Sequence, residues 1–239
     1  MTGRDRFLSA LAGHGLAFAP IVWDRLPALV HQEREDWWQD PTVGQRLIGD
    51  AAALAGADAM FVFVAAEAVR AAAAAGSRGD AALDALSRSE GAEPGAELVR
   101  ALRGVAPHAV IAAVPAPATL QRELSGEAPE AAEDAFTDFV SGSLEAGADA
   151  VAVTGDEAVE VNAGMDRALR LAQLFGRPLL AVCGDEDATK GWDEKGEPLG
   201  VISCAGDWPE NTAGVVITPG DVSGRWDAAR LRAVGTARP

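Results

Sequence analysis

Short apolar runs recur about every 30–45 residues along the chain, and most are followed by a stretch with helical periodicity. Because the runs are apolar at consecutive positions, each predicted strand is buried on both faces. This pattern is typical of a parallel sheet covered by helices. We expect about seven such strands, over residues 19–23, 58–63, 108–114, 149–154, 178–183, 200–204 and 214–218.

The segments between these runs carry apolar residues at helical spacing. Helices are predicted over residues 2–12, 42–54, 129–146, 157–175 and 226–234, with helical pieces between 67 and 103 that a loop around 89–95 interrupts. The alternation predicts an α/β fold, a TIM-type (β/α)8 barrel with one element reduced or missing. An open doubly wound sheet is the alternative. No linker divides the sequence, so residues 1–239 are expected to form a single domain.

The composition narrows the classes of partner. The formal net charge is −16, which argues against nucleic acid and anionic membranes as partners, since both require a basic surface. We find no signal-like N-terminus and no apolar run long enough to span a bilayer. We therefore expect an acidic cytoplasmic protein that acts on a small molecule. The two cysteines, Cys183 and Cys204, are expected to be reduced thiols.

Parallel α/β folds place their chemistry where the strands end, and two candidates lie at such positions. Asp156 follows the run 149–154 and precedes a predicted helix. Its carboxylate could act as a base or bind substrate, or it could cap the helix. Cys183 closes the run 178–183. It is either a reactive or metal-binding thiol or a small buried side chain.

Four further candidates lie in predicted loops. Arg25 could bind a substrate carboxylate or phosphate, and His31 could exchange protons near neutral pH. The alternatives are a surface ion pair for Arg25 and a solvated side chain for His31. Trp192 and Trp208 follow the fifth and sixth runs, where large aromatic side chains either cover a ligand pocket or pack the loops together.

Several motifs occur in a characteristic order. A helix-like segment at 6–13 precedes Pro20-Ile21-Val22-Trp23. The later motifs are Pro115-Ala116-Pro117-Ala118-Thr119-Leu120, Ala146-Gly147-Ala148-Asp149 and Val182-Cys183-Gly184-Asp185. Together they resemble the uroporphyrinogen decarboxylase family, including its methyltransferase relatives that work with corrinoid proteins. The resemblance implies a TIM-type barrel with a deep cleft at the C-terminal mouth, as a homodimer or with a partner subunit.

The chain also departs from that family. Its decarboxylases carry an arginine-rich segment after the first strand and a catalytic aspartate after the second. Here Arg25 and His31 are the only candidates in the first segment, and the carboxylate nearest to the second strand is Glu67. True uroporphyrinogen decarboxylation is therefore not expected.

The methyltransferase branch of the family binds zinc through a His-x-Cys motif and a later cysteine. In this chain Ala181 occupies the histidine position, Cys183 remains, and Asp221 lies near the position of the later cysteine. The resemblance therefore implies at most a reduced zinc site, made of Cys183, Asp221 and Cys204.

Three functions follow as hypotheses. The first is a divergent lyase of the decarboxylase type that acts on a small organic acid. Arg25 would orient the substrate, Asp156 and Asp221 would handle protons, and Cys183 would line the pocket. The second is a methyltransferase that uses a thiol or a corrinoid partner with the reduced zinc site. The third is a non-catalytic barrel that serves as a subunit or binding protein.

Overall fold

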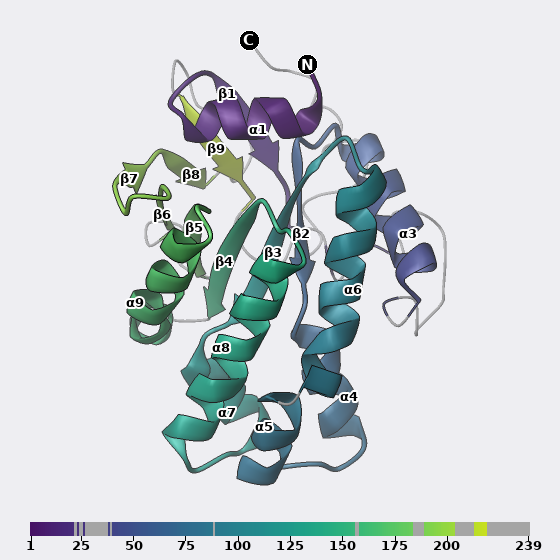
Figure 1. Cartoon of the computed structure of the whole chain (residues 1–239), viewed down its shortest axis with the longest axis vertical. Coiled ribbons are helices and arrows are strands. Elements are labelled where there is room, and N and C mark those ends of the chain that lie inside the picture. The colour runs from purple at the N-terminus through teal and green to yellow at the C-terminus, as the bar shows by residue number, and fades with distance from the viewer. Residues whose placement is uncertain are drawn as a thin grey trace.

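All seven predicted strands are present in the computed structural model (Figure 1), which describes residues 1–21, 23, 26, 38, 40–87, 89–155, 158–183, 189–203 and 213–218. They are β1 (Leu16–Ala19), β2 (Ala59–Phe63), β3 (Ala109–Pro115), β4 (Ala150–Gly155), β5 (Leu179–Cys183), β8 (Val201–Ser203) and β9 (Gly214–Ile217). The first strand begins and ends earlier than predicted, at 16–19 in place of 19–23. Two short strands were not predicted, β6 (Lys190–Trp192) and β7 (Pro198–Leu199).

The strands form two sheets that adjoin at both edges. One sheet has the order β2-β3-β4-β5-β6-β7 and the other β1-β9-β8. Neighbours are parallel except around β6, which runs antiparallel to β5 and β7. At one junction the Asp58 amide donates to the carbonyl oxygen of Phe18 at 2.8 Å, which joins β2 to β1. At the other, β6 packs against β8 through Gly191 and Val201.

Side chains alternate between two apolar layers, as the pleat of a strand requires. In β3, for example, Ala109, Ile111 and Ala113 belong to an inner cluster, whereas Val110 and Val114 belong to an outer cluster beneath the helices. The inner cluster contains residues of β1 and β9 as well as β2 to β5, so the two sheets share one interior. The described residues therefore form an α/β fold with seven parallel strands, and not the eight of a complete barrel.

Helices cover the outer layer (Figure 1), and their bounds are α3 (Pro41–Ala55), α4 (Ala66–Ala74), α5 (Asp80–Ser87), α6 (Ser89–Val105), α7 (Pro117–Leu124), α8 (Pro129–Glu145) and α9 (Ala158–Leu174). Helix α3 shows why these boundaries arise. The Asp40 side chain accepts hydrogen bonds from the amides of Thr42 and Val43, and Gly56 ends the helix with φ of 62°. In the part of the chain that is described, no helix is long and apolar enough to cross a bilayer.

The loop predicted around 89–95 is wrong, because this segment is the start of α6. The structure shows why a glycine lies in this helix, because a Cβ atom at Gly95 would lie 2.6 Å from the carbonyl oxygen of Val64. A missing side chain here allows α6 to approach the end of β2, so the glycine serves packing and not a turn. The predicted helix at 226–234 lies outside the described residues.

An N-terminal helix, α1 (Gly3–Leu11), crosses the end of the fold where the parallel strands begin (Figure 1). We call this end the amino edge. Phe7 and Ala10 of α1 are buried in the inner cluster, and the Arg4 amide donates to the carbonyl oxygen of Pro107 at 2.8 Å. The helix therefore closes the interior at the amino edge.

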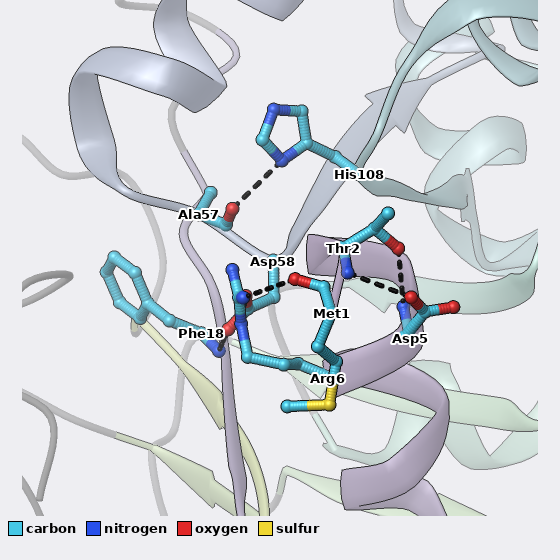
Figure 2. A network of polar contacts seen from close by, with 8 residues as sticks. All are labelled: Met1, Thr2, Asp5, Arg6, Phe18, Ala57, Asp58 and His108. Carbon is cyan, nitrogen blue, oxygen red and sulfur yellow. Dashed lines mark hydrogen bonds and ion pairs between the residues drawn. The ribbon is translucent and has the colours of Figure 1, made fainter.

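Two buried aspartates attach α1 to the strands. Each lies in a copy of the pentapeptide Ala-Gly-Ala-Asp-Ala, at residues 55–59 and 146–150, directly before a strand. Asp58 accepts from Arg6 Nε at 2.6 Å and from the Phe18 amide at 3.0 Å (Figure 2). Asp149 accepts from Arg4 Nε at 2.9 Å and from the Val110 amide at 3.1 Å. The repeated motif thus has a structural role at the amino edge, which the sequence analysis missed.

His108 adds a pH-dependent element to this edge. Its Nδ1 lies 2.9 Å from the carbonyl oxygen of Ala57 (Figure 2), and burial lowers the pKa of the imidazole, an effect that this hydrogen bond and Asp58 partly offset. The unfolded chain therefore binds the proton more readily than the folded chain does. Stability should fall as the pH decreases through the ordinary histidine pKa of about 6.5.

We expect His108→Gln to show a smaller loss of unfolding free energy than wild type when the pH is lowered from about 7 to about 5. The substitution removes the imidazole alone, so the difference between the two curves reports on His108. Urea unfolding of both proteins at a series of pH values measures this difference in unfolding free energy. Identical pH dependence in both proteins would contradict the assigned role.

Candidate functional site at the carboxyl edge

The opposite end of the strands, which we call the carboxyl edge, carries the candidate site. In parallel α/β folds this end holds the functional side chains, whereas the amino end contributes stability. Here the amino edge is occupied by α1 and its ion pairs. The helices α4 and α7 both begin directly after strands at the carboxyl edge, so their first turns also reach it.

The last inward-facing residues of β2, β4 and β5 form part of the floor of the site. Phe63 follows Phe61 on the inner face of β2, and Thr154 follows Ala152 on the inner face of β4. Both Phe63 and Thr154 are partly exposed, whereas Val182 on the neighbouring β5 is buried. The register places Thr154 beside Val182. The described floor is therefore apolar apart from one hydroxyl group.

At this floor lies a contact group of four side chains, which come from β2, from the segment after β1 and from α4. The ring centroids of Trp23 and Phe63 are 5.8 Å apart with an interplanar angle of 44°. The Trp23 indole donates its Nε1 hydrogen to Glu67 Oε1 at 3.1 Å, and Arg70 Nη1 donates to the same oxygen at 2.7 Å. The Glu67 side chain is only 13% exposed. Both donors reach the same carboxylate oxygen, so Glu67 acts as the acceptor in this group.

The sequence explains how Glu67 reaches this position. Strand β2 ends at Phe63, a short turn follows, and Glu67 lies in the first turn of α4, where a negative charge favours the helix dipole. Gly95 of α6 packs on Val64 and leaves room for this turn. The sequence analysis named Glu67 as the nearest carboxylate to β2. It missed Phe63 and Thr154 as floor residues because the register between strands was needed to identify them.

The structure places two of the predicted site residues. The backbone of Cys183 ends β5 at the carboxyl edge, in register with Gly155 of β4. Trp192 was predicted in a loop at that edge, and this placement is wrong. It lies in β6, opposite Leu179 at the start of β5, and is partly buried against the outer cluster. Because β6 runs antiparallel to β5 and pairs Trp192 with Leu179, Trp192 lies toward the amino edge. The remaining candidates lie outside the described residues: Asp156, Asp221, Arg25, His31, Trp208 and Cys204.

The described residues do not fit a zinc site. Within the described part of the chain, no group of three or more histidine, cysteine, aspartate or glutamate side chains could hold a metal ion. The position that resembles the zinc-binding histidine is Ala181, which is 3% exposed and belongs to the outer cluster. We therefore derive no chemical step through zinc.

A separate groove of about 560 Å³ lies on the outer surface between α8 and α9. Two of its lining residues form an ion pair, with Arg167 3.3 Å from Glu133. The carboxyl edge remains the candidate site, because parallel α/β folds place their functional side chains there.

Comparison with solved structures finds a methyltransferase from Methanosarcina mazei with a TM-score of 0.63. The match covers 100% of this chain and 98% of that chain, at 13% sequence identity. The two proteins are similar in fold. At this identity the likeness shows the fold alone, since one fold hosts many activities. No protein-family model and no curated protein matches the chain.

Proposed function

We propose that this protein is a divergent methyltransferase whose two sheets close into a barrel related to that of the uroporphyrinogen decarboxylase family. The observation that carries the proposal is the likeness in fold to the Methanosarcina mazei methyltransferase across the whole chain. Cys183 supports it, because this residue ends β5 at the edge where such folds place their chemistry.

The described part of the floor is apolar at Phe63 and Val182. A methyl group is uncharged and fits such a surface.

The reaction would move a methyl group between a donor and a thiol. The sulfur loses its proton and attacks the methyl carbon as a thiolate. A sulfur–carbon bond forms while the bond between that carbon and the donor atom breaks, and the donor atom leaves with the electron pair. With a methylated corrinoid as donor, the cobalt takes this electron pair and the thiol proton is released. A leaving group of another kind takes up both the electron pair and the proton. The reverse direction demethylates a thioether.

An anaerobic assay with methylcobalamin and 2-mercaptoethanol tests the proposal. We expect the enzyme to convert the absorbance of methylcobalamin to that of cob(I)alamin well above the rate without enzyme, with methylated thiol formed in equal amount. A rate no higher than the blank would contradict thiol-linked methyl transfer. Release of carbon dioxide from small organic acids would favour the lyase instead.

A further inference from the structure

Helix α1 packs on the amino edge through a close contact at its first residue. A Cβ atom on Gly3 would lie 3.1 Å from the Cα atom and the carbonyl oxygen of Asp58, and 3.1 Å from Nδ1 of His108. The Arg4 amide donates to the carbonyl oxygen of Pro107, the residue before His108, at 2.8 Å. The absence of a side chain at Gly3 thus lets the first turn of α1 cover the imidazole of His108.

The imidazole has apolar surroundings on another side. His108 lines a small pocket to which α3, β2 and α6 contribute apolar side chains, among them Ile48, Met60 and Leu102. His108 is the one titratable side chain that lines this pocket. An imidazolium at this position would therefore gain no polar partner from the pocket, and α1 limits its access to water.

Two charged groups face His108, Arg6 from α1 and Asp58 from the residue before β2. Arg6 repels an imidazolium and Asp58 attracts it, but Asp58 is already bound to Arg6 at 2.6 Å and to the Phe18 amide at 3.0 Å (Figure 2). Burial is the largest effect on the pKa of the imidazole and lowers it. Departure of α1 would hydrate the ring and remove the neighbouring guanidinium, so the proton binds more readily when α1 is away.

The attachment of α1 suits a helix that opens on its own. Its buried side chains are Phe7 and Ala10, and its two ion pairs to the strands are made by Arg4 and Arg6. The guanidinium side chains are 35% and 32% exposed, so both can regain water when the helix leaves. A single short helix held in this way opens at a lower free energy than the paired strands beneath it.

We propose that α1 is a pH-sensitive strap, which covers the amino edge while His108 is neutral and separates from it when the imidazole is protonated, with the strands still paired. Separation frees Asp58 from Arg6, so the carboxylate becomes available to the imidazolium. It also uncovers the inner cluster where Phe7 and Ala10 lay. This inference concerns the amino edge and does not depend on the proposed function.

Hydrogen–deuterium exchange, measured by mass spectrometry on peptides that cover α1, tests the strap. The step from pH 7.5 to pH 5.5 crosses the ordinary histidine pKa of about 6.5, so an opening that restores this value becomes up to about tenfold more favourable. After correction for the intrinsic exchange rate, we expect the protection of α1 to fall about five- to tenfold in wild type. It should change less than about twofold in His108→Gln. The control His14→Gln, at an exposed histidine after α1, should respond like wild type.

A second variant tests the contact at Gly3. Gly3→Ala places a methyl group against His108 and the backbone of Asp58, which should hold α1 away from the imidazole. We expect lower protection of α1 at pH 7.5 and a change of less than about threefold on acidification, because the ring is already hydrated. The matched control is Gly104→Ala in α6, where a Cβ atom meets nothing within 4 Å. It should keep the wild-type response.

Exchange of β3 separates release of the strap from unfolding of the whole chain. At pH 5.5 the amides of α1 should be clearly less protected than those of β3, because the strap opens alone. Equal protection of α1 and β3 would mean that α1 opens only when the fold does, and would overturn the inference. A wild-type α1 that does not respond to pH, or a response of the same size in His108→Gln, would overturn it as well.

Discussion

Replacement of Asp149 by alanine is expected to lower the free energy of unfolding by about 3 kcal/mol. The side chain is 0% exposed, and its oxygens accept from Arg4 at 2.9 Å and from the Val110 amide at 3.1 Å, with Arg103 at 3.4 Å. The variant leaves a buried amide without its acceptor and two cations without their partner. Both arginines are partly exposed, at 35% and 21%, and can regain water, which keeps the loss below that of a fully buried pair.

Chemical denaturation of the variant and wild type measures this loss. The matched control is Glu133→Ala, which removes an exposed carboxylate 3.3 Å from Arg167 and should cost less than about 1 kcal/mol. For a chain of this size, the Asp149→Ala loss corresponds to a melting temperature lower by roughly 6–12 °C. A change for Asp149→Ala no larger than that of the control would show that the amino edge does not depend on this contact.

Asp58 should behave like Asp149, because the two lie at equivalent places in the repeated pentapeptide. In both cases a helix ends within two residues before a glycine of positive φ, the aspartate follows after one alanine, and a parallel strand begins. Each carboxylate then bonds an amide of the neighbouring strand and an arginine of α1. The aspartates thus close the strand starts against α1, a stabilising role that fits the amino edge of a parallel fold.

The sequence predicted the long parallel strands better than the short antiparallel strands beside them. Apolar runs such as 108–114 gave both the position and the burial of β3, because a strand covered on both faces excludes polar residues along its length. The antiparallel pair β6 and β7 was missed, since three-residue and two-residue strands in a charged segment carry no periodic signal. Trp192 was misplaced for the same reason.

The candidate site could be predicted only in part. The rule that chemistry lies at the ends of parallel strands identified Cys183, whose backbone ends β5 at the carboxyl edge. Phe63 and Thr154 could not be recognised, because their inward orientation follows from the register of neighbouring strands and the two apolar layers. The link from Trp23 to Glu67 spans 44 residues of sequence, and no local pattern encodes such a contact.

Replacement of Cys183 by alanine is expected to lower kcat/KM for methyl transfer to a thiol at least about 100-fold. The residue ends β5 beside Gly155, at the edge that the proposed reaction uses, and its thiolate would take up the proton that the acceptor thiol loses when it attacks the methyl carbon. Cys183→Ser should be similarly inactive, because a hydroxyl group of the same shape does not ionise near neutral pH and cannot supply this base. A structural thiol would instead tolerate serine or alanine with little change in rate.

Leu179→Ala provides the control for this prediction. It shortens a buried side chain at the start of the same strand and should destabilise the fold by about 2–5 kcal/mol while leaving the thiol in place. If Leu179→Ala retains most of the rate and Cys183→Ala does not, the effect belongs to the sulfur and not to the packing of β5. Equal activity of Cys183→Ala and wild type in the methylcobalamin assay would remove Cys183 from the reaction and leave methyl transfer to residues elsewhere at the carboxyl edge.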